Sequence, residues 1–228
     1  MKKLEDIAFV IQARLGSQRV PQKMIKDFCG TNLLDISLVK IISSKVPTYQ
    51  FFVSAYEEEL KDICRLKNIN VFERSKESAD SEGTPMSLMY EWWNKLPFKY
   101  CILINACAPF MKSETIEKFT EAYINSSSDG MFGVMEKKNY FWNKNSELVS
   151  PWPEGQAVMN TKFVEETYEA AHCLYAGRMD KIGDGIWMGD FNKPGDIELF
   201  PMEEKECLDI DYQWQFDMCE SLYKSGVR

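Results

Sequence analysis

Four basic side chains lie close together near the N-terminus of a chain that is acidic overall. The 228 residues carry a net charge of −8, yet no acidic residue separates the four, which are Arg14, Arg19, Lys23 and Lys26. They follow a short apolar run at residues 7–12 (IAFVIQ), which is typical of a buried strand. Gly16 and Ser17 permit a turn whose backbone N–H groups can face an anion. The pattern predicts a phosphate-binding loop after the first strand, against the alternative of a solvated basic loop.

Two carboxylates near the C-terminus could hold a divalent cation. Asp209 and Asp211 are separated by one residue in the stretch LDID at residues 208–211. If this stretch is extended, both carboxylates lie on one face while the two aliphatic side chains enter the core. Carboxylate, phosphate and water oxygens are ligands that Mg²⁺ takes in proteins. The pair therefore predicts a site for Mg²⁺ or Mn²⁺, against the alternative of an acidic strand end.

Composition disfavours several other classes of protein. The negative charge argues against broad contact with nucleic acid or anionic lipid. The seven cysteines are odd in number and never spaced as CxxC, which is typical of reduced thiols. No apolar run reaches the length of a membrane span, so we expect a cytoplasmic protein without membrane contact. The single histidine, His172, lies in an apolar stretch, and a structural role is favoured over a substrate contact.

Apolar runs alternate with helical patterns through the first half of the chain. Strands are predicted at residues 7–12, 51–55, 70–74 and 100–105, and helices at 32–45, 57–67, 84–96 and 113–125. The helix at 84–96 is expected to carry Pro85 in its first turn. This order is typical of an α/β fold with a doubly wound, mostly parallel sheet and flanking helices. Ligands of such sheets bind at the carboxyl ends of the strands.

One segment interrupts this alternation. Residues from about 137 to 157 are rich in aromatic residues, asparagine, serine and proline, and they predict a small inserted arm. The arm could form a dimer interface or a rim of the substrate site. No internal repeat or low-complexity linker divides the chain, so residues 1–228 are expected to form a single domain.

The stretch IQARLGSQRVPQK at residues 11–23 resembles the block IPARxGSxRxPxKN that opens the CMP-nonulosonate synthetases, the acylneuraminate cytidylyltransferase family. It is also similar to the opening of the related CMP-KDO synthetases. Three further stretches resemble this family in the same order along the chain. They are Phe72-Glu73-Arg74 followed by Asp80 and Gly83, the run YEAAHCLY at residues 168–175, and LDID followed by Asp217.

The resemblance implies a Rossmann-like nucleotidyltransferase fold and a specific reaction. CTP and a sugar acid would give a CMP-sugar and pyrophosphate for surface polysaccharide biosynthesis. The acceptor would be a sialate-, legionaminate- or pseudaminate-like nonulosonate, whose anomeric hydroxyl attacks the α-phosphorus while Mg²⁺ neutralises phosphate charge. Because members of the family form dimers, the resemblance also implies a homodimer in which the arm of one subunit completes the site of the other.

Individual site residues follow from the same resemblance. Arg14, Lys23 and Asp211 are expected to be catalytic, and Asp209 with Asp211 to bind the metal. The residues expected to contact the nucleotide are Ala13, Arg14, Gly16, Ser17, Arg19, Lys23, Arg74, Asp80 and Asn105.

Three alternatives remain open. A glycosyltransferase that uses a nucleotide sugar would take Asp209-Ile210-Asp211 as its DxD metal motif, although that motif normally lies in the middle of the chain. A cytidylyltransferase that acts on a different acidic or phosphorylated acceptor would use the same residues. A nucleotide-binding protein without catalytic activity would also fit them.

Overall fold

The computed structural model describes residues 1–80 and 84–227, and its sheet confirms the predicted α/β class. Seven strands form one sheet in the order β3-β2-β1-β4-β6-β5-β7. They are β1 (Ile7–Gln12), β2 (Phe51–Ala55), β3 (Asn70–Glu73), β4 (Tyr100–Ile104), β5 (Gly130–Lys137), β6 (Thr167–Arg178) and β7 (Ile197–Pro201). Within the described chain β6 alone runs antiparallel to its neighbours, so the sheet is mostly parallel. Gly83, part of the family resemblance, lies outside the described residues.

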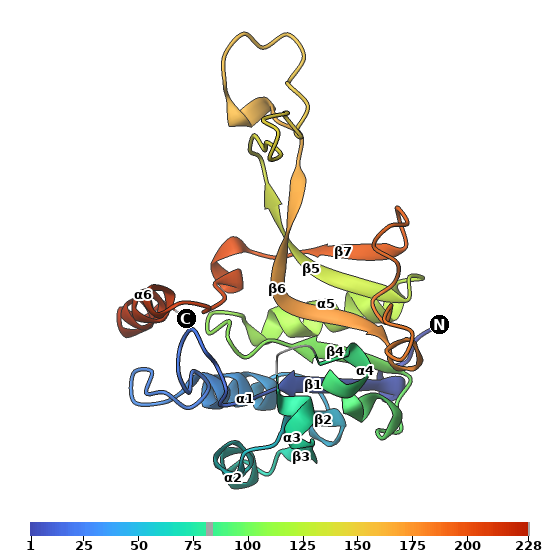
Figure 1. Cartoon of the computed structure of the whole chain (residues 1–228), viewed down its shortest axis with the longest axis vertical. Coiled ribbons are helices and arrows are strands. Elements are labelled where there is room, and N and C mark those ends of the chain that lie inside the picture. The colour runs from blue at the N-terminus through green and yellow to red at the C-terminus, as the bar shows by residue number, and fades with distance from the viewer. Residues whose placement is uncertain (81–83, 228) are drawn as a thin grey trace.

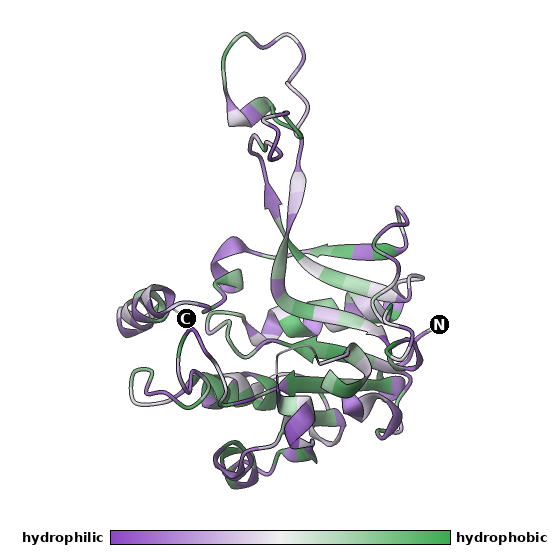
Figure 2. Cartoon of the chain, viewed as in Figure 1, coloured by the Kyte–Doolittle hydropathy of each residue, from purple (hydrophilic) through white to green (hydrophobic). Residues whose placement is uncertain are grey.

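Three helices cover one face of this sheet (Figure 1). They are α1 (Leu33–Ser43), α2 (Glu58–Leu66) and α5 (Ser113–Asn125), and they share one core with alternate residues of β1. Asn32 is the N-cap of helix α1, and its side chain accepts a hydrogen bond from the Asp35 N–H at 2.8 Å. Figure 2 shows the strands largely hydrophobic, with polar residues along the outer sides of the helices. The helices thus bury the apolar side chains of the strands.

The opposite face is covered by short elements, which corrects the single helix predicted at residues 84–96. The structure has α4 (Met86–Met89) and a 3₁₀ turn at Glu91–Asn94, and Pro85 precedes the first turn as its N-cap. The rings of Tyr90 and Trp92 lie 5.4 Å apart and pack in one core against this face of the sheet. Residues two positions apart do not face the same side of an α-helix, so burying both rings interrupts the helix.

Strands β5 and β6 continue beyond the sheet as a projecting arm (Figure 1). The segment between them runs from residue 138 to 166, so the arm extends past the boundary predicted near residue 157. The Tyr140 ring lies 5.4 Å from Trp152 and 6.2 Å from Trp142. Both tryptophans remain exposed. The arm therefore presents an apolar, aromatic surface.

The C-terminal helix α6 (Gln213–Lys224) packs on the loop that follows β1. Phe216 of α6 meets Phe28 of the loop edge-on, with the ring centroids 5.3 Å apart. Val20 and Ile210, both fully buried, belong to the same cluster. Figure 1 shows the loop and the C-terminal segment next to each other although they lie at opposite ends of the sequence. This packing brings the basic loop to the two carboxylates.

The cysteines and the described helices bear on two expectations from the sequence. All seven cysteines are free, as their spacing predicts. None of the described helices is long and apolar enough to cross a bilayer.

Candidate active site

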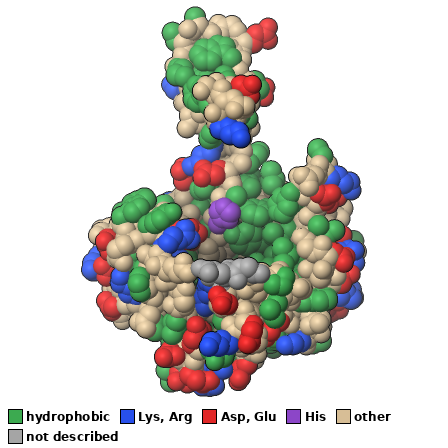
Figure 3. Space-filling view, in the orientation of Figure 1, with side chains coloured by type: hydrophobic (Ala, Val, Ile, Leu, Met, Phe, Trp, Pro, Cys, Tyr) green, Lys and Arg blue, Asp and Glu red, His purple; other side chains and the backbone are tan. Residues whose placement is uncertain are grey.

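A pocket of about 370 Å³ opens at the carboxyl ends of β1 and β4, where parallel sheets bind their ligands. Its polar lining comes from separate stretches of the chain and includes Arg14, Arg74, Asp80 and Asn105. Its apolar lining includes Met89, Tyr90, Leu103, Tyr175, Trp187 and Met188. Figure 3 shows a hollow with a largely hydrophobic wall beside the single histidine. The structure thus brings together four residues that were expected to contact a nucleotide.

Arg74 is the most buried cation of this pocket, with 5% of its surface exposed. One guanidinium N–H donates to the Ala13 carbonyl at 2.5 Å, while Nε has no partner among the described residues. Burial lowers the pKa of Arg74 from its ordinary value to about 10; Glu57 opposes that shift and Arg14 adds to it. The group is therefore still protonated at neutral pH. A buried charge without a full set of partners is costly, so this cation is arranged to meet an electron-rich ligand.

The structure divides the basic loop, which was expected to form one phosphate cradle. Arg14 lines the pocket, whereas Arg19 and Lys23 face Asp211, with N···O distances of 2.6 and 3.6 Å. Lys23 also donates to the Ile210 carbonyl. The positive charge of the loop is thus split between the pocket and the carboxylate pair.

The glycine and serine of the loop lie apart from both groups. Gly16 and Ser17 are absent from the pocket lining, and the Ser17 N–H donates to the Leu15 carbonyl at 2.8 Å. The backbone donor expected to face a phosphate is therefore used inside the loop in this structure. Lys26 is also directed away from the pocket, because it donates to Gln213 of α6 at 2.8 Å.

The two carboxylates lie on an irregular segment rather than in a strand. Its backbone is anchored where the Ile210 N–H donates to the Cys107 carbonyl at 3.0 Å, and Ile210 is fully buried. Asp209 and Asp211 both line a second pocket of about 390 Å³. Burial raises the pKa of Asp209, and the charge of Asp211 adds to this rise. A buried carboxylate whose charge is disfavoured by a neighbouring carboxylate is an arrangement that a cation would relieve.

Asn105 connects the two pockets. Its Nδ2 donates to the His172 carbonyl at 2.8 Å and to Asp209 Oδ1 at 3.3 Å. Its Oδ1 accepts the Cys107 N–H at 2.9 Å, so the amide orientation is fixed from both sides. A ligand held by Asn105 would therefore lie beside the carboxylates.

A buried carboxylate braces the loop that carries Asn105. Glu206 is 2% exposed, and it accepts the backbone N–H of Lys112 at 3.0 Å and pairs with its Nζ at 3.0 Å. Lys40 of α1 donates to the Pro109 carbonyl in the same loop. Burial lowers the pKa of Lys40 from 10.5 to about 8, against the opposing charge of Glu206. These contacts fix the loop after β4 to the segment that precedes Asp209.

The apolar wall of the first pocket, which includes Trp187 and Met188, lies against the sheet at two glycines. A Cβ at Gly177 would be 2.0 Å from the Trp187 carbonyl oxygen, and one at Gly130 would be 1.6 Å from that of Met188. Such an approach of two backbones is possible only without a side chain. The glycines therefore set how deep Trp187 lies in the pocket.

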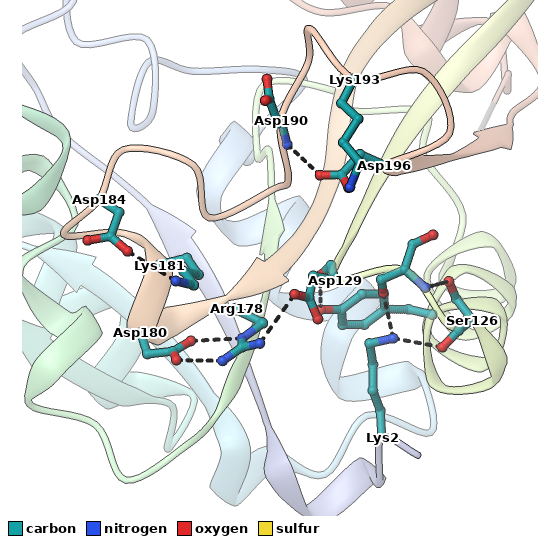
Figure 4. A network of polar contacts seen from close by, with 12 residues as sticks. Lys2, Ser126, Asp129, Arg178, Asp180, Lys181, Asp184, Asp190, Lys193 and Asp196 are labelled. Atoms are coloured by element: carbon teal, nitrogen blue, oxygen red, sulfur yellow. Dashed lines mark hydrogen bonds and ion pairs between the residues drawn. The ribbon is translucent and has the colours of Figure 1, made fainter.

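A polar network anchors the same wall at its base (Figure 4). The Arg178 N–H donates to the Trp187 carbonyl at 2.8 Å. Its guanidinium pairs with Asp180 at 2.7 Å and Asp129 at 3.3 Å, which ties the wall to the start of β5. Sequence reasoning did not find this wall, because no local pattern marks residues 179–196 as part of a site.

His172 is the second feature that sequence reasoning did not assign to the site. A structural role was favoured, but the side chain is exposed and lines the pocket of the two carboxylates. Its backbone has a φ of +54°, in the left-handed region that non-glycine residues seldom adopt. A sequence pattern does not report this conformation, because it arises where the pairing of β5 with β6 shifts register.

Comparisons with known proteins point to one kind of chemistry. Residues 8–181 match the family model described as Cytidylyltransferase. Pseudaminic acid cytidylyltransferase of Campylobacter jejuni is 22% identical and aligns over 94% of this chain and 95% of its own length. N-acylneuraminate cytidylyltransferase B of Danio rerio is 21% identical over 93% of this chain and 50% of its own.

Solved structures share the fold at lower identity. CMP-2-keto-3-deoxy-manno-octonic acid synthetase complexed with CTP superimposes with a TM-score of 0.68 at 12% identity, covering 96% of this chain and 99% of that one. The 4-diphosphocytidyl-2C-methyl-D-erythritol synthase of Anaerococcus prevotii gives a TM-score of 0.63 at 12% identity, with 96% of each chain covered.

Proposed function

Because this chain belongs to the cytidylyltransferase family, and is thus a nucleotidyltransferase, we propose that it transfers the cytidylyl group of CTP to a nonulosonate sugar acid and releases pyrophosphate. The observation that carries the proposal is the position of Asn105, which joins a pocket holding Arg14 and Arg74 to the carboxylate pair. The relatives named as pseudaminic acid and N-acylneuraminate cytidylyltransferases favour a sugar acid as acceptor.

The nucleotide would occupy the pocket of about 370 Å³. Arg74 supplies a buried charge with an unused N–H, and Arg14 supplies a second cation in the lining of the same pocket. Both would donate charge-assisted hydrogen bonds to oxygens of CTP, which are stronger than neutral ones. Asn105 and Asp80 would complete the nucleotide contacts.

The carboxylate pair fits a hard divalent cation of the Mg²⁺ type. Both groups offer oxygen ligands, and the described residues contain no group of three or more His, Cys, Asp or Glu side chains that could hold a metal ion. Phosphate and water oxygens would therefore have to complete the coordination. Such an ion, when bound, polarises the phosphates and offsets their charge. Asp209 and Asp211 would hold it, and Mn²⁺ could replace it.

Arg19 and Lys23 would act on the leaving group. They lie beside Asp211, so phosphates bound next to that carboxylate would meet both cations. Donors placed where charge develops stabilise the transition state more than the bound substrate. The two residues would therefore neutralise pyrophosphate as it leaves, while Arg14 holds the α-phosphate end of the nucleotide.

We further propose a homodimer formed through the arm at residues 138–166. Exposed Trp142 and Trp152 on a projecting segment are typical of an interface, and the arm could complete the neighbouring site. The resulting CMP-sugar would serve surface polysaccharide biosynthesis in the cytoplasm, where CTP is available.

Turnover with defined acceptors tests the function. The purified protein would be incubated with CTP, Mg²⁺ and one of three acids: pseudaminic acid, N-acetylneuraminic acid or 2-keto-3-deoxy-manno-octonic acid. Pyrophosphate release should depend on the acid in at least one case. Binding of CTP by calorimetry without turnover on any acid would favour a different acceptor or a non-catalytic role.

A further inference from the structure

The backbone of His172 is the starting point. At a φ of +54° a side chain with a Cβ is strained, whereas glycine adopts this conformation without cost. Strain of this kind concentrates at functional sites, where the rest of the structure imposes it. If this position of β6 needed only the backbone conformation, a glycine would provide it without strain. A role for the imidazole would explain why a histidine and not a glycine stands at this position.

The position of the ring indicates what that is. The His172 carbonyl accepts from Asn105, which also contacts Asp209, so the residue lies next to the carboxylate pair. Nδ1 lies 3.2 Å from the hydroxyl of Tyr175, and Tyr175 lines the pocket assigned to the nucleotide. The ring thus stands where the two pockets meet, as Figure 3 shows for the exposed histidine beside the hollow. An acceptor that attacks the α-phosphorus has to approach this junction.

The other cations of the region are either assigned to the nucleotide or paired with carboxylates. Arg14 and Arg74 line the nucleotide pocket, and Arg19 and Lys23 face Asp211. Lys137 lines the carboxylate pocket but pairs with Glu204 and with Glu169.

The two nitrogens of His172 are used differently. Nδ1 faces Tyr175, and Nε2 has no hydrogen bond with the described residues. The carboxylate of a sugar acid needs a donor, because burying an unpaired charge is costly. Nε2 of His172 is an available one.

We propose that His172 binds the carboxylate of the acceptor through its Nε2–H group, while Tyr175 fixes the ring through Nδ1. This assignment rests on the proposed function, and it explains why β6 holds a strained histidine at the junction. The residue selects the acceptor and takes no part in binding CTP.

The variant His172→Gly tests this directly, because it removes the imidazole and keeps the backbone conformation. The Michaelis constant for the acid that the wild type uses should rise roughly 10- to 100-fold, the loss expected for one hydrogen bond to a charged group. The constant for CTP should not change, and the melting temperature should not fall. His172→Gln keeps a donor near the position of Nε2 and should recover part of the loss.

Asn68→Gly is the matched control. Asn68 is exposed at the end of α2 with a φ of +55°, so this variant relieves the same backbone strain away from the site. It should leave both Michaelis constants unchanged.

Two results would overturn the inference alone: an unchanged acceptor constant in His172→Gly, or an equal rise in the constant for CTP. A wild-type protein without turnover on any of the three acids would overturn the proposed function, and this inference with it.

Discussion

Replacing Asp211 with asparagine should abolish metal-dependent turnover and leave the fold nearly as stable as before. The substitution keeps the volume of the side chain and removes its charge. Asp211 pairs with Arg19 at 2.6 Å, and the two side chains are 36% and 52% exposed; its second pair, with Lys23, is longer at 3.6 Å. An ion pair exposed to this extent contributes about 1 kcal/mol or less to the free energy of unfolding.

The two expected effects differ greatly in size. A loss of ~1 kcal/mol lowers the melting temperature of a chain of this length by about 2–4 °C. Changing a group that only supports a metal ligand commonly costs 10–100-fold in affinity or activity, so removing the ligand itself should lower kcat/KM by at least about 100-fold. A large kinetic effect with a small thermal effect would separate a role in the reaction from a role in folding.

Pyrophosphate release would be followed over a titration of Mg²⁺, together with a thermal melt of each variant. Asp62→Asn is a suitable control, because Asp62 forms an exposed ion pair with Arg65 at 2.7 Å on α2, away from the pockets. The control should lose as little stability as Asp211→Asn and keep its activity. Wild-type turnover in Asp211→Asn at every Mg²⁺ concentration would refute the assignment of this carboxylate.

Three further outcomes are expected. Arg14→Ala should weaken CTP binding by calorimetry by roughly 1.5–3 kcal/mol, the contribution of one charge-assisted hydrogen bond, and an unchanged dissociation constant would contradict its role. Because the pKa of Lys40 falls from 10.5 to about 8 on folding, the unfolded chain binds more protons between these values, so the free energy of unfolding should rise with pH across them. Melts of Lys40→Met should show a smaller rise, and an identical pH profile would refute that explanation. Gly177→Ala should lower the melting temperature and the kcat/KM for the acid, because its Cβ would meet the Trp187 carbonyl at 2.0 Å; wild-type values for both would show that the wall can shift without consequence.

The first four strands of the sheet, β1 to β4, were predictable because their signals are local, whereas β5 and β7 were not predicted. The runs at 7–12 and 51–55 are short, apolar and bounded by turn residues, and both became strands with the predicted ends. The helix at 84–96 was predicted wrongly, because the burial of Tyr90 and Trp92 on one face depends on the sheet beneath them. Local propensity carries no information about that sheet.

The candidate site could be predicted only in part for the same reason. The resemblance pointed to Arg14, Arg74, Asp80 and Asn105, which lie in separate stretches, and the structure brings them to one pocket. Trp187 reaches the same pocket because its backbone lies against Gly177 of β6 and that of Met188 against Gly130 of β5, which no sequence pattern shows. The unusual backbone conformation of His172 lies where the pairing of β5 with β6 shifts register, which no sequence pattern shows either. Sequence therefore indicated the polar half of the site but not the apolar half.

The most direct test of cytidylyl transfer is to follow the α-phosphorus of CTP. With CTP labelled at that atom, Mg²⁺ and an accepted sugar acid, the label should appear in a CMP-sugar and the released pyrophosphate should carry none. A sugar product without label, or label that remains in CTP although CTP and the acid are bound, would contradict the account.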